Sequence, residues 1–342
     1  MKKLERKLGD LIPIKHFLIT GFSRNAFFLL IKAYGWEKPA EIIIPAYTCP
    51  VIKHTVEAAN AIPVPVDAEA AGLNIDPDLI VKAITKNTRA IYVVHTYGTP
   101  AQIQRICSIA REYDLIVIED LAHSLFTTYQ GKQLGTFGDY AILSFTKQIV
   151  DFEGGAIATN HTAIYRKMMK LREQYQQESR FSFNWLIDSY VRLIGSCWES
   201  SFSRSALCFM LLNDWINKTY YKGSYGIRID PSKFYASSMG SRLALLQLER
   251  LYEKKRKMIA DWNDTRHLPG QMEKNSSFIS PYNTKLVSDP DYFVRYHSFR
   301  TWHNPHELGL YPRSDCLFRQ LRIFSRSKSH FREAPGVIPE VE

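Results

Sequence analysis

Short apolar runs alternate with longer amphipathic stretches along the first half of the chain. The apolar runs predict buried strands at residues 41–45, 61–67, 89–95 and 114–120. The amphipathic stretches that lie between or before these runs predict helices at residues 25–36, 50–61, 76–84 and 100–113. Strands that alternate with helices in this way are typical of βαβ units around a mostly parallel sheet. The sequence therefore predicts an α/β fold.

Single residues mark the ends of several predicted elements. Gly35 closes the helix 25–36, and Asp76 stands where an N-cap residue begins the helix 76–84. The prolines within 61–67 place that strand at an edge of the sheet, because proline has no N–H to donate to a neighbouring strand.

The second half of the chain has a different pattern. Residues 161–255 are predicted to be largely helical. Within them, residues 239–262 predict a long amphipathic helix with Leu243, Leu246 and Leu251 near one face. Beyond about residue 265 the pattern weakens, and the final stretch is basic and irregular.

The length and charge of the chain narrow the class of protein further. The 342 residues suggest about two domains, enough for a large core. Lys and Arg number 44 against 34 Asp and Glu, a net charge of +10. These cations are scattered and no nucleic-acid-binding motif accompanies them, so nucleic-acid binding rests on charge alone and is not expected.

The cysteines and the apolar segments indicate a location. Five cysteines, an odd number without CxxC spacing, argue against a disulfide framework or a metal site and favour a reducing compartment. The basic N-terminus lacks the apolar core of a signal peptide. Residues 205–216, an apolar stretch, have roughly half the length that a bilayer requires. We expect a cytoplasmic protein without a membrane span.

Polar residues at strand and helix ends are the candidates for chemistry, because doubly wound sheets bind ligands at the carboxyl ends of their strands. Asp120 closes the strand 114–120, and Lys147 follows the apolar run AILSF and precedes Glu-Gly-Gly. Ser23 and Arg24 open a helix, whose N–H groups favour anions. Taken singly, Asp120 could be a helix N-cap and Lys147 a solvated surface lysine. His95, at another strand end, is by itself more typical of a hydrogen-bonded core residue.

The order of these features along one α/β domain points to a pyridoxal phosphate site. The phosphate of that cofactor needs a helix N-terminus, its ring nitrogen a carboxylate, and its aldehyde an amine. The helix start at Ser23, then Asp120 and then Lys147 provide these groups in turn.

Four stretches carry a family resemblance: IIIPAYTCPVIKHTVEAANAIPVPVD, NIDPDLIVKAITKNTRAIYVVHTYGTP, VIEDLAHSLFTTYQGKQLGTFGDYAILSF and K-x5-EGGAIATN. In their order and spacing they resemble the DegT/DnrJ/EryC1/StrS family of sugar aminotransferases. The resemblance implies the fold of type I pyridoxal-phosphate-dependent transferases, a mostly parallel central sheet with flanking helices and a smaller C-terminal α+β domain. It predicts a large cofactor-binding domain over 1–235, with a helical insertion at about 161–230. A small domain over 236–342 is expected to be truncated relative to the family.

The resemblance also implies roles for individual residues. Lys147 looks like the catalytic lysine that holds the cofactor through a Schiff base, and Asp120 like the partner of the ring nitrogen. The other implied cofactor-binding residues are Ser23, Arg24 and Ser144 at the phosphate, Ala122 on a ring face, His123 near the phenolic oxygen, and Cys49 beside the ring. Cys49 departs from the family, since many members carry an aromatic residue there that stacks on the ring.

The implied function is transfer of an amino group from an amino acid, expected to be glutamate, to a nucleotide-linked keto-sugar. A homodimer is expected from the resemblance. Related dehydratases replace the lysine with histidine, and Lys147 argues against that activity. The alternative that stays open is a non-catalytic family member that binds the cofactor or a sugar and has a regulatory or interaction role.

Overall fold

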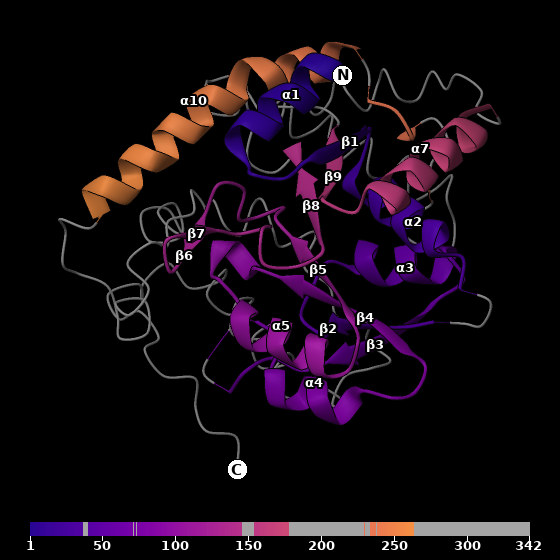
Figure 1. Cartoon of the computed structure of the whole chain (residues 1–342). Helices are drawn as coiled ribbons and strands as arrows, with labels where there is room; N and C mark the ends of the chain where they lie inside the picture. The colour runs from indigo at the N-terminus through magenta and orange to yellow at the C-terminus, as the bar shows by residue number, and fades with distance from the viewer. Residues whose placement is uncertain are drawn as a thin grey trace, which may run out of the picture.

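Seven strands form one central sheet in the computed structural model of the protein (Figure 1). The structure describes residues 1–36, 40–70, 72, 74–145, 154–177, 229, 233–236 and 238–262. The strands, in sheet order, are β3 (Ile62–Val66), β2 (Glu41–Pro45), β4 (Thr88–Val94), β5 (Ile116–Asp120), β8 (Tyr140–Ser144), β9 (Gly155–Thr159) and β1 (His16–Thr20). The first five are parallel to one another, whereas β9 is antiparallel to both β8 and β1. The predicted mostly parallel sheet is thus confirmed.

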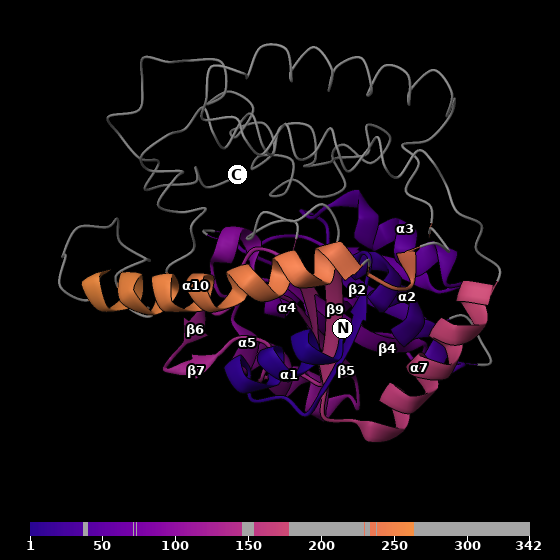
Figure 2. The ribbon, with the colours of Figure 1, turned by 90° about the horizontal axis from the view of Figure 1, so that it is seen from above.

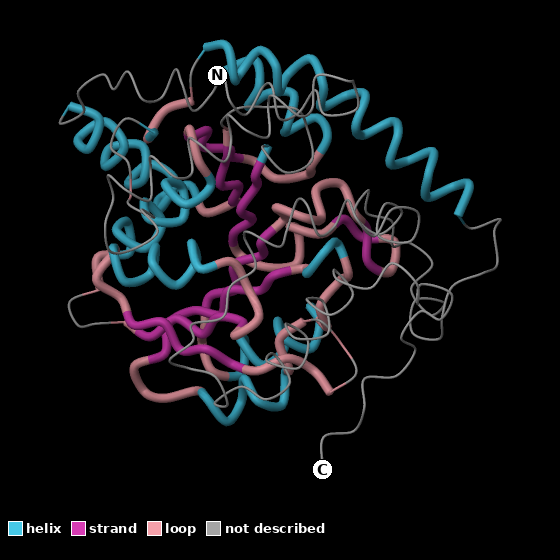
Figure 3. The backbone as a smooth tube through the Cα atoms, turned by 180° about the vertical axis from the view of Figure 1, so that it is seen from behind, coloured by secondary structure: helices cyan, strands magenta, loops and turns pink. Residues whose placement is uncertain are grey.

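Helices cover both faces of this sheet, as Figure 2 and Figure 3 show. One face carries α2 (Ser23–Tyr34), α3 (Pro50–Ala58) and α7 (Thr162–Gln177). The other carries α1 (Lys2–Leu11), α4 (Pro77–Ala83), α5 (Ile103–Glu112) and α10 (Ser238–Trp262). The remaining short elements are η1 (Thr96–Gly98) and the hairpin of β6 (Thr128–Tyr129) and β7 (Lys132–Gln133).

The two helical layers explain the continuous apolar runs of the strands. In β2, Ile43 packs in the core beneath α4 and α5, while Ile42 and Ile44 pack beneath α2 and α3. A strand buried on both faces has no polar side to alternate with its apolar side. This is why the strands read as apolar stretches of four or five residues.

Several predicted element ends are confirmed. Gly35 follows α2 with φ of 60°, the left-handed conformation that lets a glycine end a helix. The Asp76 side chain accepts a hydrogen bond of 2.8 Å from the N–H of Asp78 at the start of α4. The proline-containing strand β3 lies at the end of the sheet, as its prolines predict.

Other elements differ from the sequence prediction. The helix α2 begins at Ser23, two residues earlier than predicted, and α1, β1 and β9 were not predicted at all. The placement of Leu246 near the apolar face of α10 is wrong, because its side chain is 71% exposed. Among the residues of this helix whose burial is described, the buried apolar side chains are Ala244, Leu248 and Leu251, which are spaced by four and three residues.

Some predictions fall outside the described residues. These include Lys147, most of the helical insertion expected at about 161–230, and most of the small domain expected over 236–342. The domain boundary therefore stays a prediction. No helix within the described ranges combines the length and the apolar character needed to cross a membrane.

Candidate functional site

The candidate residues gather at one edge of the sheet. Asp120 ends β5 and Ser144 ends β8, and these two strands are parallel neighbours. Because β9 runs the opposite way, it begins at the same edge, where Gly155 pairs with Ser144. Thr20 at the end of β1 pairs with Gly155 as well, so that α2 also begins there, at Ser23. Parallel sheets bind their ligands at this edge.

The same residues also share one face of the sheet. Successive side chains of a strand point to opposite faces, so Asp120 lies on the face of Ile118 and Ser144 on the face of Ile142. Ile118 and Ile142 both belong to the core beneath α2 and α3. Cys49 is the N-cap residue of α3, on this face. Because these residues share both an edge and a face of the sheet, they lie in one region.

Asp120 is a buried carboxylate held at both oxygens. Its side chain is 8% exposed; Oδ1 accepts a hydrogen bond of 2.7 Å from the N–H of Ala122, and Oδ2 accepts one of 2.8 Å from the hydroxyl of Tyr92. Residues 122–126 form turns and not a helix, so the interpretation of Asp120 as a helix N-cap is wrong. The predicted residues Ala122 and His123 lie in this turn, half-buried, directly beyond the carboxylate.

Tyr92 is the donor that sequence reasoning missed. Burial raises the pKa of its phenol well above the usual range, and the neighbouring Asp120 carboxylate raises it further. The hydroxyl therefore keeps its proton and donates. The charge of Cys49 acts on Tyr92 in the same direction, which indicates that the thiol lies near this pair. A tyrosine within an otherwise apolar strand was the signal in the sequence.

The start of α2 packs directly on β9. A Cβ added to Gly155 would lie 2.6 Å from Cα of Ser23 and 2.8 Å from the carbonyl carbon of Phe22. The N–H of Gly154 donates a 2.6 Å hydrogen bond to the carbonyl oxygen of Gly21. The two glycines of the Glu-Gly-Gly motif thus allow the strand to approach the helix N-terminus closely.

Positive charge is concentrated around this helix start. The first turn of α2 contains no acidic residue. The Arg24 guanidinium lies 4.3 Å from the centre of the Phe22 ring, and the ammonium of Lys233 lies 5.5 Å from the same ring. Lys233 is 5% exposed, and its carbonyl oxygen accepts a 2.8 Å hydrogen bond from the N–H of Gly21. Together with the helix dipole, these cations favour an anion.

Glu119, the residue before Asp120, has a different role on the opposite face of the sheet. Its carboxylate is completely buried and accepts hydrogen bonds of 2.8, 2.8 and 2.7 Å from the N–H groups of Gly135, Phe137 and Gly138. His95 Nδ1 accepts a hydrogen bond from the N–H of Ala101, so Nε2 carries the proton and donates to Glu119 over 3.2 Å. His95 is therefore a hydrogen-bonded core residue.

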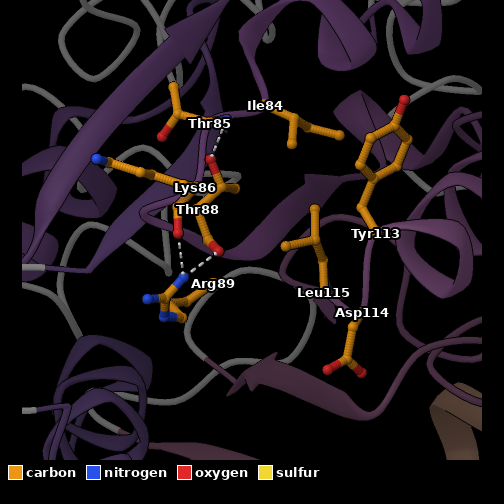
Figure 4. A pocket seen from close by; sticks show the side chains of 8 residues that line it. All are labelled: Ile84, Thr85, Lys86, Thr88, Arg89, Tyr113, Asp114 and Leu115. Atoms are coloured by element: carbon orange, nitrogen blue, oxygen red, sulfur yellow. Dashed lines mark hydrogen bonds between the residues drawn. The ribbon is translucent and has the colours of Figure 1, made fainter.

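A surface pocket of about 560 Å³ lies at the opposite edge of the sheet (Figure 4). It is lined by residues at the amino ends of β4 and β5, namely Ile84, Thr85, Lys86, Thr88, Arg89, Tyr113, Asp114 and Leu115. Arg89 Nη1 donates hydrogen bonds of 2.9 Å each to the carbonyl oxygens of Lys86 and Thr88. None of the predicted site residues lines this pocket.

Comparison with known proteins agrees with the resemblance seen in the sequence. The model of the DegT/DnrJ/EryC1/StrS aminotransferase family matches residues 1–187. The chain is 34% identical over 180 residues to GDP-perosamine synthase of Caulobacter vibrioides, with 52% of this chain and 48% of the relative covered. It is also 34% identical over 175 residues to a pleiotropic regulatory protein of Geobacillus stearothermophilus, with 50% of this chain and 47% of the relative covered. The chain thus spans about half the length of the curated relatives it matches.

A solved structure is similar over a larger part of the fold. A DegT DnrJ EryC1 StrS aminotransferase from Brucella abortus shares 17% identity at a TM-score of 0.61, with 93% of this chain and 82% of that structure covered. The expected fold class is thereby confirmed. The family model covers more than half of the chain, and the protein belongs to the DegT/DnrJ/EryC1/StrS aminotransferase family.

Proposed function

We propose that the protein is a pyridoxal-phosphate-dependent aminotransferase that moves an amino group from glutamate to a nucleotide-linked keto-sugar. The observation that supports this best is the position of Asp120, a buried strand-end carboxylate on the same edge and face as the N-terminus of α2. The name of the relative GDP-perosamine synthase supports a nucleotide-linked sugar as the substrate class.

The described residues fit the cofactor. The start of α2 offers backbone N–H groups and two nearby cations, and its first turn contains no acidic residue, which suits a phosphate. The buried hydroxyl of Ser144 lies on the same face and would add a donor. Asp120 would face the ring nitrogen. Lys147, two residues beyond Phe145 along the chain, would supply the amine.

When bound, pyridoxal phosphate supplies an aldehyde that reacts with amines and a ring that stabilises negative charge on the adjoining carbon. The carboxylate of Asp120 would hold a proton on the ring nitrogen, which would strengthen this effect. The Lys147 amine would hold the cofactor and would serve as the acid–base group that moves the proton from Cα of the donor amino acid. Proton transfer by a positioned side chain contributes about 10²–10⁴-fold to the rate.

Reduction with borohydride tests the assignment of Lys147. The purified protein is expected to be yellow, and borohydride should add the mass of the cofactor to the peptide that contains Lys147. A Lys147→Ala variant should fold and remain unlabelled. A colourless wild-type protein, or label on another lysine, would contradict the proposal.

We further propose that the active form is a homodimer, because the sites of similar enzymes are completed by a second subunit. Light scattering on the eluting protein should give twice the mass of one chain. A monomer that transfers amino groups at full rate would argue against this assembly.

A second candidate function is a non-catalytic regulator that keeps the cofactor site. Cys49 stands where many relatives place an aromatic side chain, and one relative is named a pleiotropic regulatory protein. Bound cofactor without amino transfer from glutamate to a panel of nucleotide-linked keto-sugars would favour this candidate.

A further inference from the structure

We propose that Tyr92 is a positioning residue that fixes the Asp120 carboxylate for the ring nitrogen of the cofactor. The inference rests on the proposed function and adds a residue that acts through Asp120.

The sheet register produces this contact. In the parallel pair of β4 and β5, Tyr92 pairs with Ile118 and Val94 pairs with Asp120. Tyr92 and Asp120 therefore lie on the same face, two positions apart on neighbouring strands. A tyrosine side chain is long enough to bridge that diagonal, and its hydroxyl donates to Oδ2 of Asp120 over 2.8 Å.

The side chain of Tyr92 is surrounded by apolar groups, so packing alone does not explain its hydroxyl. Its neighbours on this face of β4 are Ala90 and Val94, and its ring packs on Phe27 with centroids 4.6 Å apart. The side chain is 2% exposed. An apolar side chain would fill this core equally well, and a buried hydroxyl is costly unless it forms a hydrogen bond.

The two hydrogen bonds of Asp120 together define its orientation. The N–H of Ala122 holds Oδ1 from the turn beyond the strand, and the Tyr92 hydroxyl holds Oδ2 from the neighbouring strand. Because each oxygen accepts a hydrogen bond, rotation about the Cβ–Cγ bond is restricted. Hydrogen bonds to a charged group are also the stronger class, and they stabilise the ionised carboxylate. The Asp120 carboxylate is thus held in one orientation before a ligand binds.

The test compares Tyr92→Phe with the wild type for two ligands, pyridoxal phosphate and its analogue in which a C–H replaces the ring nitrogen. Dissociation constants are measured by titrating the cofactor-free protein and following tryptophan fluorescence. We expect Tyr92→Phe to weaken pyridoxal phosphate binding about tenfold, and to change binding of the analogue less than twofold. The matched control is Tyr34→Phe, which removes a hydroxyl bonded to the Tyr140 hydroxyl over 2.6 Å, away from Asp120. It should leave both constants unchanged.

Equal weakening for both ligands would assign Tyr92 a merely structural role and overturn the inference, as would no weakening for either. A second measurement uses Asp120→Asn as background, where adding Tyr92→Phe should have no further effect on pyridoxal phosphate binding. A wild-type protein that binds neither ligand would instead overturn the proposed function on which the inference depends.

Discussion

Glu119 and Asp120 are adjacent carboxylates with opposite roles. The alternation of side chains along β5 directs Asp120 toward the face of α2 and α3, at the candidate site, and Glu119 toward the other face. Both are buried, but Glu119 is surrounded by N–H donors of the turn at 135–138. The same pair of residues thus places one carboxylate at the candidate site and one where it organises a loop.

The Glu119→Gln variant tests the structural carboxylate. In glutamine, an NH2 group replaces one of the two carboxylate oxygens. That NH2 group would face either the N–H of Gly135 or the N–H groups of Phe137 and Gly138, which would lose their acceptor. We expect the free energy of unfolding to fall by about 2–4 kcal/mol, because buried donors lose their charged partner. Urea denaturation measures the change. The control Glu112→Gln, on the exposed surface of α5, should change it by less than about 0.5 kcal/mol.

Cys107 and Cys49 should differ in reactivity. Burial raises the pKa of the Cys107 thiol from 9.0 to about 12, and the charge of Glu119 adds to the effect. Only the thiolate is a nucleophile, so at pH 8 this shift lowers the reactive fraction about 1,000-fold. We expect iodoacetamide to label the half-buried Cys49 at least tenfold faster than Cys107 in the folded protein, as measured by peptide mass spectrometry.

The labelling rate of Cys107 should keep rising above pH 9, where an ordinary thiol levels off, and should increase when urea unfolds the chain. Equal rates for Cys49 and Cys107 at pH 8 in the folded protein would contradict the burial of the Cys107 side chain, which is 7% exposed.

At the scale of elements, the contact between β9 and the start of α2 is the closest packing in the candidate site. Gly155→Ala would press a methyl group against the backbone of Ser23. We expect this substitution to lower the free energy of unfolding by about 2 kcal/mol or more and to weaken phosphate binding, because the helix start must move. The control is Gly9→Ala in α1, where the nearest atom to the new methyl group is 3.9 Å away. That change should be neutral or stabilising by up to about 1 kcal/mol. A denaturation curve that places Gly155→Ala at wild-type stability would contradict the packing described.

The elements that sequence predicted were those with a local signal. Apolar runs bounded by turns predicted four strands of the parallel sheet, and capping residues such as Asp76 predicted helix starts. β9 gave no such signal, since GAIAT is short and rich in small residues. Its position between β8 and β1 depends on pairing with a strand more than 130 residues earlier in the chain.

In the candidate site, too, the residues with a local sequence signal could be predicted and the contacts that depend on the fold could not. Asp120, Ser23 and Ser144 could be proposed from strand and helix ends or from resemblance. The hydrogen bonds of Tyr92 and of Glu119 could not, because they depend on sheet register and on a loop that returns from 15 to 20 residues away. The contact of Arg172 could not be predicted from the sequence either, since it donates to the carbonyl oxygen of Ile19, 153 positions away.

At the scale of the whole molecule, the candidate site and the surface pocket lie at opposite edges of the sheet. The candidate site lies at the carboxyl ends of the strands, and the pocket of Figure 4 lies at the amino ends. We expect Arg89→Ala to lower the free energy of unfolding by about 1 kcal/mol, because two carbonyl oxygens lose their donor. The dissociation constant for pyridoxal phosphate should change less than twofold, measured by fluorescence titration. A large loss of cofactor affinity at full stability would show that the two edges communicate.

The antiparallel pairing of β8 and β9 has a consequence for how this family can vary. The N–H of Phe145 donates to the carbonyl oxygen of Gly154 over 3.0 Å, so the segment that contains Lys147 is tied at both of its ends to one point of the sheet. Insertions or deletions between those two anchors leave the register of all seven strands untouched. Under the proposed function, a change of loop length between these anchors would therefore alter the reach of the lysine without disturbing the core strands.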